Sequence, residues 1–482
     1  MSFVTEKFIL FIAVVFAVYF AVYRAAPKAQ WAVLLAASWV FYAFASVKFC
    51  FFLLFSAATT WSCALLTDKA EAKERKKLIL TCCLLMNIGA LVVLKYTGLI
   101  MNLFGHNGAG KFLLPLGISF YTFQSAGYCI DVYRGKAKPE RNFFRYALFV
   151  SYFPQISEGP IGRYGELAPQ LLAPHGFSYD RFASGLARTV TGAFKKLFVA
   201  NTLASFVNTV YSSPESYSGI VLSVAAVFYT FQIYADFSGY IDMALGISEC
   251  LGISLAENFR APDFAVSVND FWKRWHISLT SWFRDYLYIP LGGNRRGTLR
   301  KYLNKMIVFL VSGLWHGADL SFLLWGGLHG AYVVAGEAIM PWRNWVVKRL
   351  GINREGLMHR MFCTARTFAL VTFAWIFFRE DSISQAFLVI RRIFTSFYYD
   401  GWSVSILAQY DIHYFVTVMI GLLILLFIEF HEKSGPFSSW LSAKPTAVRW
   451  GVLYVLMLCL AYVIIFSNVK AADASNFIYF QF

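Results

Sequence analysis

Long apolar stretches separated by short, polar and mostly basic loops make up most of this chain of 482 residues. Many of the stretches approach the roughly 20 residues that an α-helix needs to cross the hydrocarbon core of a bilayer. The pattern predicts an all-α polytopic membrane protein with about 11–13 membrane or re-entrant helices. We expect spans near 7–24, 31–47, 49–67, 78–97, 112–131, 143–157, 183–210, 219–250, 304–318, 320–339, 364–379, 413–430 and 449–468.

The amino-acid composition agrees with this reading. Hydrophobic residues make up 58% of the chain, the mean hydropathy is +0.55, and only 15% of residues are charged. Soluble domains carry about 25% charged residues. A water-soluble protein of this composition would expose large apolar patches, so a soluble fold is excluded.

The net charge of +16 is compatible with nucleic-acid binding, but its distribution argues against that. Lysine and arginine cluster in the loops 69–77, 273–305 and 343–366, as the positive-inside rule predicts for a membrane protein. We therefore expect membrane lipid and no nucleic acid as a partner. Loops 24–30 and 68–77 should face the cytoplasm, which puts the N-terminus outside and makes the first span a retained helix.

The chain shows no internal repeat and no linker long enough to separate domains, which favours one membrane domain over 1–482. Its eight cysteines lie singly in apolar stretches apart from the pair Cys82–Cys83. They show no CxxC spacing and no Cys/His cluster of the zinc type. We therefore interpret them as reduced, small hydrophobic residues and expect no metal.

Two tryptophan-flanked histidines stand out in this apolar background, His276 in Arg-Trp-His and His316 in Leu-Trp-His-Gly. A histidine at membrane depth is costly unless it is neutral, hydrogen-bonded or facing a polar cavity. His316 follows the apolar run 306–314, and burial would keep its ring neutral and able to accept a proton. These are the properties of a general base, although a structural histidine bonded across helices is the alternative.

The run 268–287 around His276 has its tryptophans at helical spacing and predicts an amphipathic helix at an interface or a channel mouth. The alternative is a surface helix in which His276 only caps or packs. His329 follows His316 by thirteen residues, about 20 Å along a continuous helix. We therefore expect His316 and His329 not to share a metal, and we assign His329 a structural or cavity-lining role.

Other polar groups interrupt the apolar runs. Asp236 and Asp242 lie within the span 219–250, and their expected partners are arginines of 274–300. Proton-relay carboxylates of a transporter would look the same. The basic loop 292–297 could hold phosphate, although a turn is commoner, and the segment 153–164, broken at two prolines, is interpreted as a membrane-exit turn.

The segments FWKRWHISLTSWFRDYLYIPLGG (271–293) and GLWHGADLSFLLWGGLHG (313–330) closely resemble the membrane-bound O-acyltransferase family. Within it, the bacterial branch that acetylates alginate is most similar. The resemblance is specific across 112–338, which we take as the catalytic core, whereas 339–482 is expected to supply C-terminal membrane helices. It implies a helical fold around a transmembrane tunnel, with His316 and His276 as the two catalytic residues.

The resemblance further implies an O-acetyltransferase of the bacterial inner membrane that uses acetyl-CoA as donor and binds no cofactor or metal. It would pass the acetyl group outward for O-acetylation of a cell-envelope or secreted polysaccharide such as alginate. The chain has no GxSxG elbow, so a separate extracytoplasmic, serine-hydrolase-like transferase is the expected partner. Substrate-binding or tunnel-lining residues are expected to be Trp275, Trp282, Arg284, Asp285, Trp315, Asp236, Ser238 and Tyr240, with Arg284, Arg295 and Arg296 near the donor phosphates.

Two alternatives stay open at this stage. The acyl group could be D-alanyl or another acyl, delivered to a teichoic-acid-type polymer or to peptidoglycan. The protein could instead transport or flip an acyl or polymer intermediate, since a transporter would also have many spans and buried carboxylates. The absence of a sequence repeat and the presence of both Trp-His motifs favour the acyltransferase.

Overall fold

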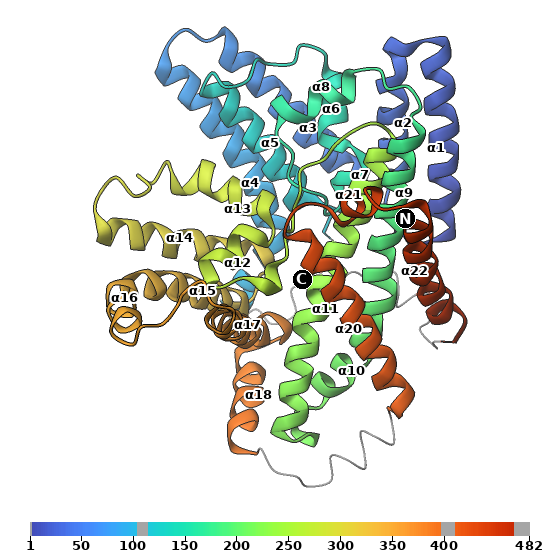
Figure 1. Ribbon diagram of the computed structural model, residues 1–482. Helices are drawn as coiled ribbons and strands as arrows, with labels where there is room; N and C mark the ends of the chain where they lie inside the picture. The colour runs from blue at the N-terminus through green and yellow to red at the C-terminus, as the bar shows by residue number, and fades with distance from the viewer. Residues whose placement is uncertain (1, 104–113, 397–409, 467–482) are drawn as a thin grey trace. The chain divides into compact units, whose positions relative to one another are not determined.

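The computed structural model describes residues 2–103, 114–396 and 410–466, and these residues contain helices and turns but no β-strand (Figure 1). The predicted all-α fold is therefore confirmed. Residues 112–113 and 467–468 of two predicted spans lie outside the described residues. The chain forms two compact units: unit 1 contains residues 1–192 and 240–257, and unit 2 contains residues 193–239 and 258–482.

The helices of unit 1 lie within or overlap the predicted spans, apart from α8, which no apolar run predicted. Three of them, α3, α4 and α5, pack against one another, as do α1 and α2 (Figure 1). The helices are α1 (Glu6–Ala25), α2 (Gln30–Ala43), α3 (Phe49–Lys69), α4 (Lys73–Leu103), α5 (Ile118–Tyr133), α6 (Phe143–Ser151), α7 (Phe153–Ile156), α8 (Tyr164–Leu172) and α9 (Tyr179–Ala193).

Unit 2 contains the other helices, and α11 contributes its first part to unit 2 and its last part, from Tyr240 on, to unit 1. A π-helical segment over 194–200 links α9 to α10. The helices are α10 (Asn201–Ser212), α11 (Gly219–Cys250), α12 (Val268–Arg274), α13 (Ile277–Phe283), α14 (Thr298–His316), α15 (Leu320–Ala338), α16 (Met340–Arg349), α17 (Leu357–Arg379), α18 (Ile383–Thr395), α20 (Ile412–Glu432), α21 (Phe437–Ser442) and α22 (Thr446–Phe466).

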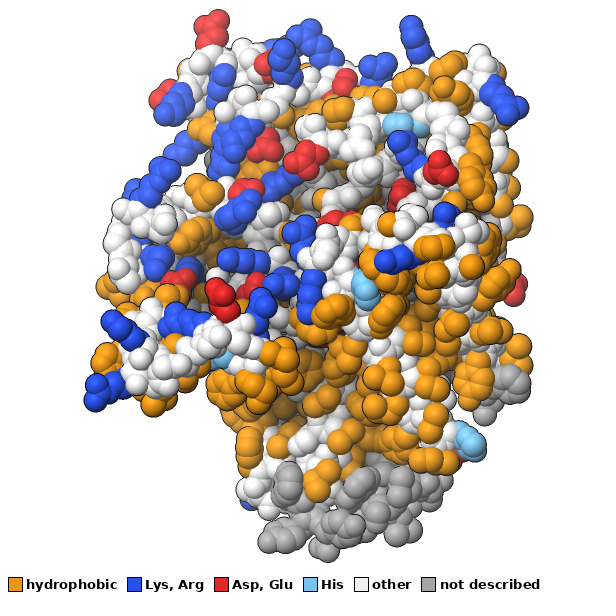
Figure 2. Space-filling model, viewed as in Figure 1, with side chains coloured by type: hydrophobic (Ala, Val, Ile, Leu, Met, Phe, Trp, Pro, Cys, Tyr) orange, Lys and Arg blue, Asp and Glu red, His pale blue; other side chains and the backbone are white. Residues whose placement is uncertain are grey.

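Seven of the described helices are long and apolar enough to span a bilayer, or eight if the bent pair α15–α16 is one span. They expose large apolar side chains along their length, such as Ile412 and Leu423 of α20, which are 70% and 62% exposed. Figure 2 shows apolar side chains over α20 and basic side chains over α14 to α16. The protein is therefore a multi-pass membrane protein whose exposed apolar faces contact lipid.

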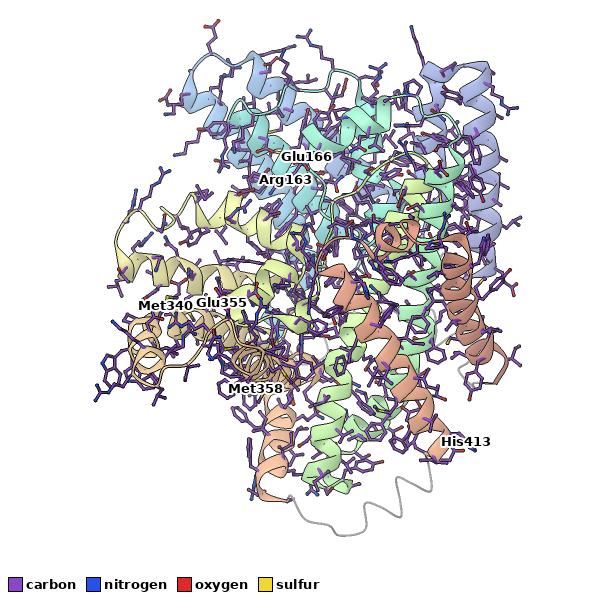
Figure 3. All side chains as sticks on the ribbon, in the orientation of Figure 1. Arg163, Glu166, Met340, Glu355, Met358 and His413 are labelled. Carbon is purple, nitrogen blue, oxygen red and sulfur yellow. The ribbon has the colours of Figure 1, made fainter. Side chains whose placement is uncertain are left out.

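Helix α16 and the start of α17 have the character of a membrane interface. Met340 at the start of α16 and Met358 at the start of α17 are both exposed (Figure 3), and the exposed Trp342 and Trp345 lie between them. Tryptophan beside basic residues is typical of the headgroup region. This composition fits a segment at the membrane surface between the apolar helices α15 and α17.

One detail of the predicted helices is wrong. The run 268–287 is not one helix, because α12 ends at Arg274 and α13 begins at Ile277. This error occurs where the side chain of Asn258 contacts the backbone, which periodicity does not report. The segment 153–164 contains α7 and a turn, and its residues 153–161 are buried within unit 1. Its interpretation as a membrane-exit turn stays a prediction. The predicted division into a core at 112–338 and a C-terminal part stays a prediction.

Candidate active site

His316 is the last residue of α14, and α14 packs closely against α15. The turn between them places Asp319 at the N-cap of α15, where its carboxylate accepts a hydrogen bond from the Ser321 amide at 2.9 Å. The His316 side chain is 4% exposed and therefore lies inside unit 2. The predicted burial of His316 is confirmed.

His276 lies between α12 and α13 in a left-handed backbone conformation, with φ 46° and ψ 53°. A non-glycine residue in this region costs about 1–3 kcal/mol, and such strain is concentrated at functional sites. The conformation turns the chain sharply after Trp275 and buries the His276 side chain completely. An unbroken helix over 268–287 could not place this side chain in the same way.

Asn258, which precedes His276 by eighteen residues, holds this turn in place. Its side-chain oxygen accepts hydrogen bonds from the Ser278 amide at 3.0 Å and the Ser278 hydroxyl at 2.8 Å. The same oxygen lies 3.3 Å from Nδ1 of His276. Because this atom accepts from the Ser278 amide it must be the oxygen, so Nδ1 carries the proton and the lone pair of the neutral ring is on Nε2.

The two imidazole rings lie near each other in unit 2, with centroids 6.4 Å apart and planes inclined by 62°. Trp315 contacts both, at 5.9 Å from the His276 ring and 4.8 Å from the His316 ring. Phe237 contacts His276 and both Trp325 and Phe378 contact His316. Burial lowers the pKa of His276 to about 3, so this ring is neutral at physiological pH.

His329 occupies a cluster of aromatic rings beside this pair. Its Nδ1 accepts a hydrogen bond from Nε1 of Trp272 at 3.1 Å, and its ring lies 5.0 Å from Trp325, which also contacts His316. The assumption of one continuous helix from His316 to His329 is wrong, because residues 317–319 separate α14 from α15. Among the described residues, no group of three metal-ligating side chains includes these histidines.

The buried carboxylates of α11 pair with cations other than those predicted. Asp236 bonds to Lys196 in unit 2, and Asp242 bonds to Arg188 at 3.0 Å in unit 1. The expectation of partners among the arginines of 274–300 is wrong. Lys196 lies in the predicted span 183–210, and a charge within a span was the signal that could have identified it.

The remaining predicted site residues fall into three settings. Trp275 and Trp282 are buried in unit 2, as is Ser238 of α11. Tyr240 belongs to unit 1, where it stacks on Phe3 at 4.7 Å and hydrogen-bonds Ser157. The cations lie at the surface: the Arg284 side chain is 63% exposed and pairs with Asp285, and Arg295 and Arg296 are exposed in the loop before α14.

Asn258 was not predicted, because a polar residue in a non-periodic loop gives no sign of what it contacts.

We expect Asn258→Ala to reduce acyl transfer about 10²-fold. The substitution removes the group that orients the His276 ring, and a misplacement of a catalytic group by about 1 Å lowers a rate by about that factor. Asn258→Asp, which keeps an oxygen acceptor, should retain most activity and raise the pKa of His276. Transfer rates measured over a range of pH, with thermal unfolding of each variant, check this; equal loss in both variants would show a purely structural role.

The sequence was also compared with known proteins. The profile of MBOAT, the membrane-bound O-acyltransferase family, matches residues 139–375, which include His276 and His316. The chain is 37% identical to a probable alginate O-acetylase of Pseudomonas fluorescens over 77% of this chain and 71% of that protein. It is 34% identical to the probable alginate O-acetylase of Pseudomonas putida over 93% of this chain and 94% of that protein.

A peptidoglycan O-acetyltransferase of Helicobacter pylori is 34% identical over 75% of this chain and 72% of that protein. The family resemblance drawn from the two histidine motifs is thereby confirmed. Identity of this extent, over so much of both chains, shows that the protein belongs to the membrane-bound O-acyltransferase family and is an O-acyltransferase.

Proposed function

We propose that this protein takes an acetyl group from cytoplasmic acetyl-CoA and passes it across the bacterial inner membrane, where a polysaccharide such as alginate becomes O-acetylated. The pair of buried imidazoles in unit 2 carries this proposal, because a neutral, desolvated histidine suits proton removal from a hydroxyl. The names of the alginate O-acetylase relatives support the donor and the acceptor class.

In the proposed reaction His316 removes the proton of the acceptor hydroxyl while the oxygen of that hydroxyl attacks the thioester carbonyl. The new C–O bond forms, the C–S bond breaks, and the departing thiolate takes the proton from His316 to leave free CoA. The thioester is already activated, so this step uses only side chains of the protein. His316 therefore starts and ends the cycle as a neutral base.

We propose that His276 acts through its neutral ring and not as a hydrogen-bond donor to the substrate. Orienting a carbonyl or stabilising an oxyanion needs an N–H donor, whereas Asn258 leaves a lone pair on Nε2 of the neutral ring. The neutral ring of His276, whose centroid lies 6.4 Å from that of His316, would instead stabilise the positive charge that His316 gains when it takes the proton. The surrounding rings, Trp315 first among them, would exclude water that hydrolyses the thioester.

The remaining elements of the proposal concern access to the site. Trp275, Trp282, Ser238 and the two acidic residues Asp236 and Asp285, all in unit 2, would line or support a tunnel through the membrane. The exposed Arg284, Arg295 and Arg296 are suited to the CoA phosphates, since guanidinium groups bind phosphate in a bidentate manner. The donor would then enter from the cytoplasm, the N-terminus would lie outside, and a serine-hydrolase-like partner would receive the acetyl group there.

Purified protein in proteoliposomes tests this function. With radiolabelled acetyl-CoA outside and a polysaccharide or partner acceptor present, we expect free CoA thiol and labelled acceptor to appear in equal amounts. A transporter would move label without releasing thiol, which would contradict the proposal. D-alanyl thioester donors and peptidoglycan acceptors belong in the same assay, because one relative is a peptidoglycan O-acetyltransferase.

A further inference from the structure

Three cysteine side chains from three different helices meet in the interior of unit 1. Cys63 of α3, Cys83 of α4 and Cys129 of α5 are buried, with 3%, 5% and 1% of their surface exposed. Their Sγ atoms all lie within 4.8 Å of one another, and those of Cys83 and Cys129 are 4.0 Å apart. We call these three residues the three-thiol cluster; the sequence offered no sign of it, because the residues are 20 and 46 positions apart.

We propose that the three-thiol cluster binds one soft metal ion, Cu(I). Metal–thiolate bonds are about 2.3 Å long. Three sulfurs arranged in a plane around one ion at that distance are about 4.0 Å apart. The Cys83–Cys129 separation already has this value, and Cys63 lies within 4.8 Å of both, so a shift of less than about 1 Å completes a trigonal site.

The number and chemistry of the ligands select the ion. Thiolate sulfur is a soft donor and favours Cu(I), zinc and iron–sulfur centres over hard ions such as Mg²⁺. Structural zinc sites are almost always four-coordinate. Within the described residues, no further histidine, cysteine or carboxylate joins the cluster at the same spacing. Three sulfurs without a fourth ligand therefore suit Cu(I) better than zinc.

Neighbouring polar groups fit thiolates at this position. Nδ2 of Asn87 lies 3.8 Å from Sγ of Cys83, and the Thr67 hydroxyl lies 4.0 Å from Sγ of Cys63. Hydrogen-bond donors around metal-bound sulfur tune and orient the ligands. Because each thiol that binds as a thiolate releases a proton, we expect metal affinity to fall as the pH is lowered.

The simpler explanation is that the thiols only pack and donate to helix carbonyls. Cys129 lies 3.4 Å from the Thr60 carbonyl, Cys83 lies 3.8 Å from that of Thr59, and Cys63 lies 4.0 Å from that of Ile79. Such bonds account for each thiol separately. They do not account for the convergence of three sulfurs from α3, α4 and α5, which is what a metal site requires.

The test is a Cu(I) titration of the full-length protein, purified under reducing, anaerobic conditions, in competition with a coloured Cu(I) chelator. We expect one ion per chain, an increase in the unfolding temperature, and an X-ray absorption spectrum with about three sulfur neighbours near 2.3 Å. Cys129→Ala should lose the stoichiometric binding. Cys82→Ala is the matched control, since Cys82 is exposed beside Cys83 in the same helix and should leave binding intact.

Cys63→Ala provides a second variant in case Cys129→Ala does not fold, and it should lose binding equally. Zinc in place of Cu(I) should bind more weakly in the same competition format. The proposal is overturned if Cu(I) does not bind, if binding persists in both cluster variants, or if Cys82→Ala removes it.

Discussion

Replacing His316 by alanine is expected to leave a folded membrane protein with little or no acyl transfer. His316 is the proposed base, and general-base catalysis contributes about 10²–10⁴-fold to a rate. We therefore expect release of CoA from acetyl-CoA to fall by at least about 10²-fold in proteoliposomes. His316→Gln, which keeps a polar side chain but cannot act as a base near neutral pH, should be as inactive as His316→Ala.

The control for this experiment is His413→Ala. His413 lies at the start of α20 and is exposed (Figure 3), so its removal should leave activity unchanged. Gel filtration and thermal unfolding in detergent report whether each variant is folded. A His316→Ala protein that transfers acetyl groups at nearly the wild-type rate would remove His316 from the role of base.

Replacing Gly326 by alanine is expected to destabilise unit 2 and reduce activity, whereas Gly327→Ala should be neutral or stabilising. A Cβ atom at Gly326 would overlap the Phe309 carbonyl oxygen and lie 3.2 Å from the Cα of Gly313. α14 and α15 would have to separate, and overpacking of this kind costs about 1–3 kcal/mol. Since α14 carries His316 at its end, the ring of the proposed base would move with the helix.

Gly327 is a matched control because it is the next residue of the same helix. A Cβ there lies 3.6 Å from the Leu310 side chain, an ordinary contact, and alanine in a helix is favoured over glycine by about 1 kcal/mol. The midpoints of thermal unfolding in detergent, with CoA-release rates, give the comparison. Equal midpoints for the two variants would show that the close approach of α14 and α15 is not important for stability.

Most of the helices could be predicted from the sequence. Spans such as 7–24, 49–67 and 413–430 coincide with α1, α3 and α20 to within a few residues. Their lengths follow from local physics, because every backbone group in a bilayer must bond within its own helix. The two histidine motifs also identified the family, since they lie within the part of the chain that matches its profile.

The same reasoning could not predict interactions between distant parts of the chain. The partner of Asp236 is Lys196, forty residues earlier, and not an arginine of 274–300. A buried charge signals that it has a partner, but hydropathy gives no information about which cation the fold brings to it. Asn258, which orients the His276 ring, was not predicted for the same reason.

The apolar runs by themselves determined that this is a helical, multi-pass membrane protein, and the Trp-His motifs determined which family to expect. Only the tertiary structure decided that the chain turns at His276, that the rings of His276 and His316 come within 6.4 Å, and that three separate cysteines converge. Helix formation depends on contacts within a few residues along the chain, whereas these arrangements depend on how helices pack against one another.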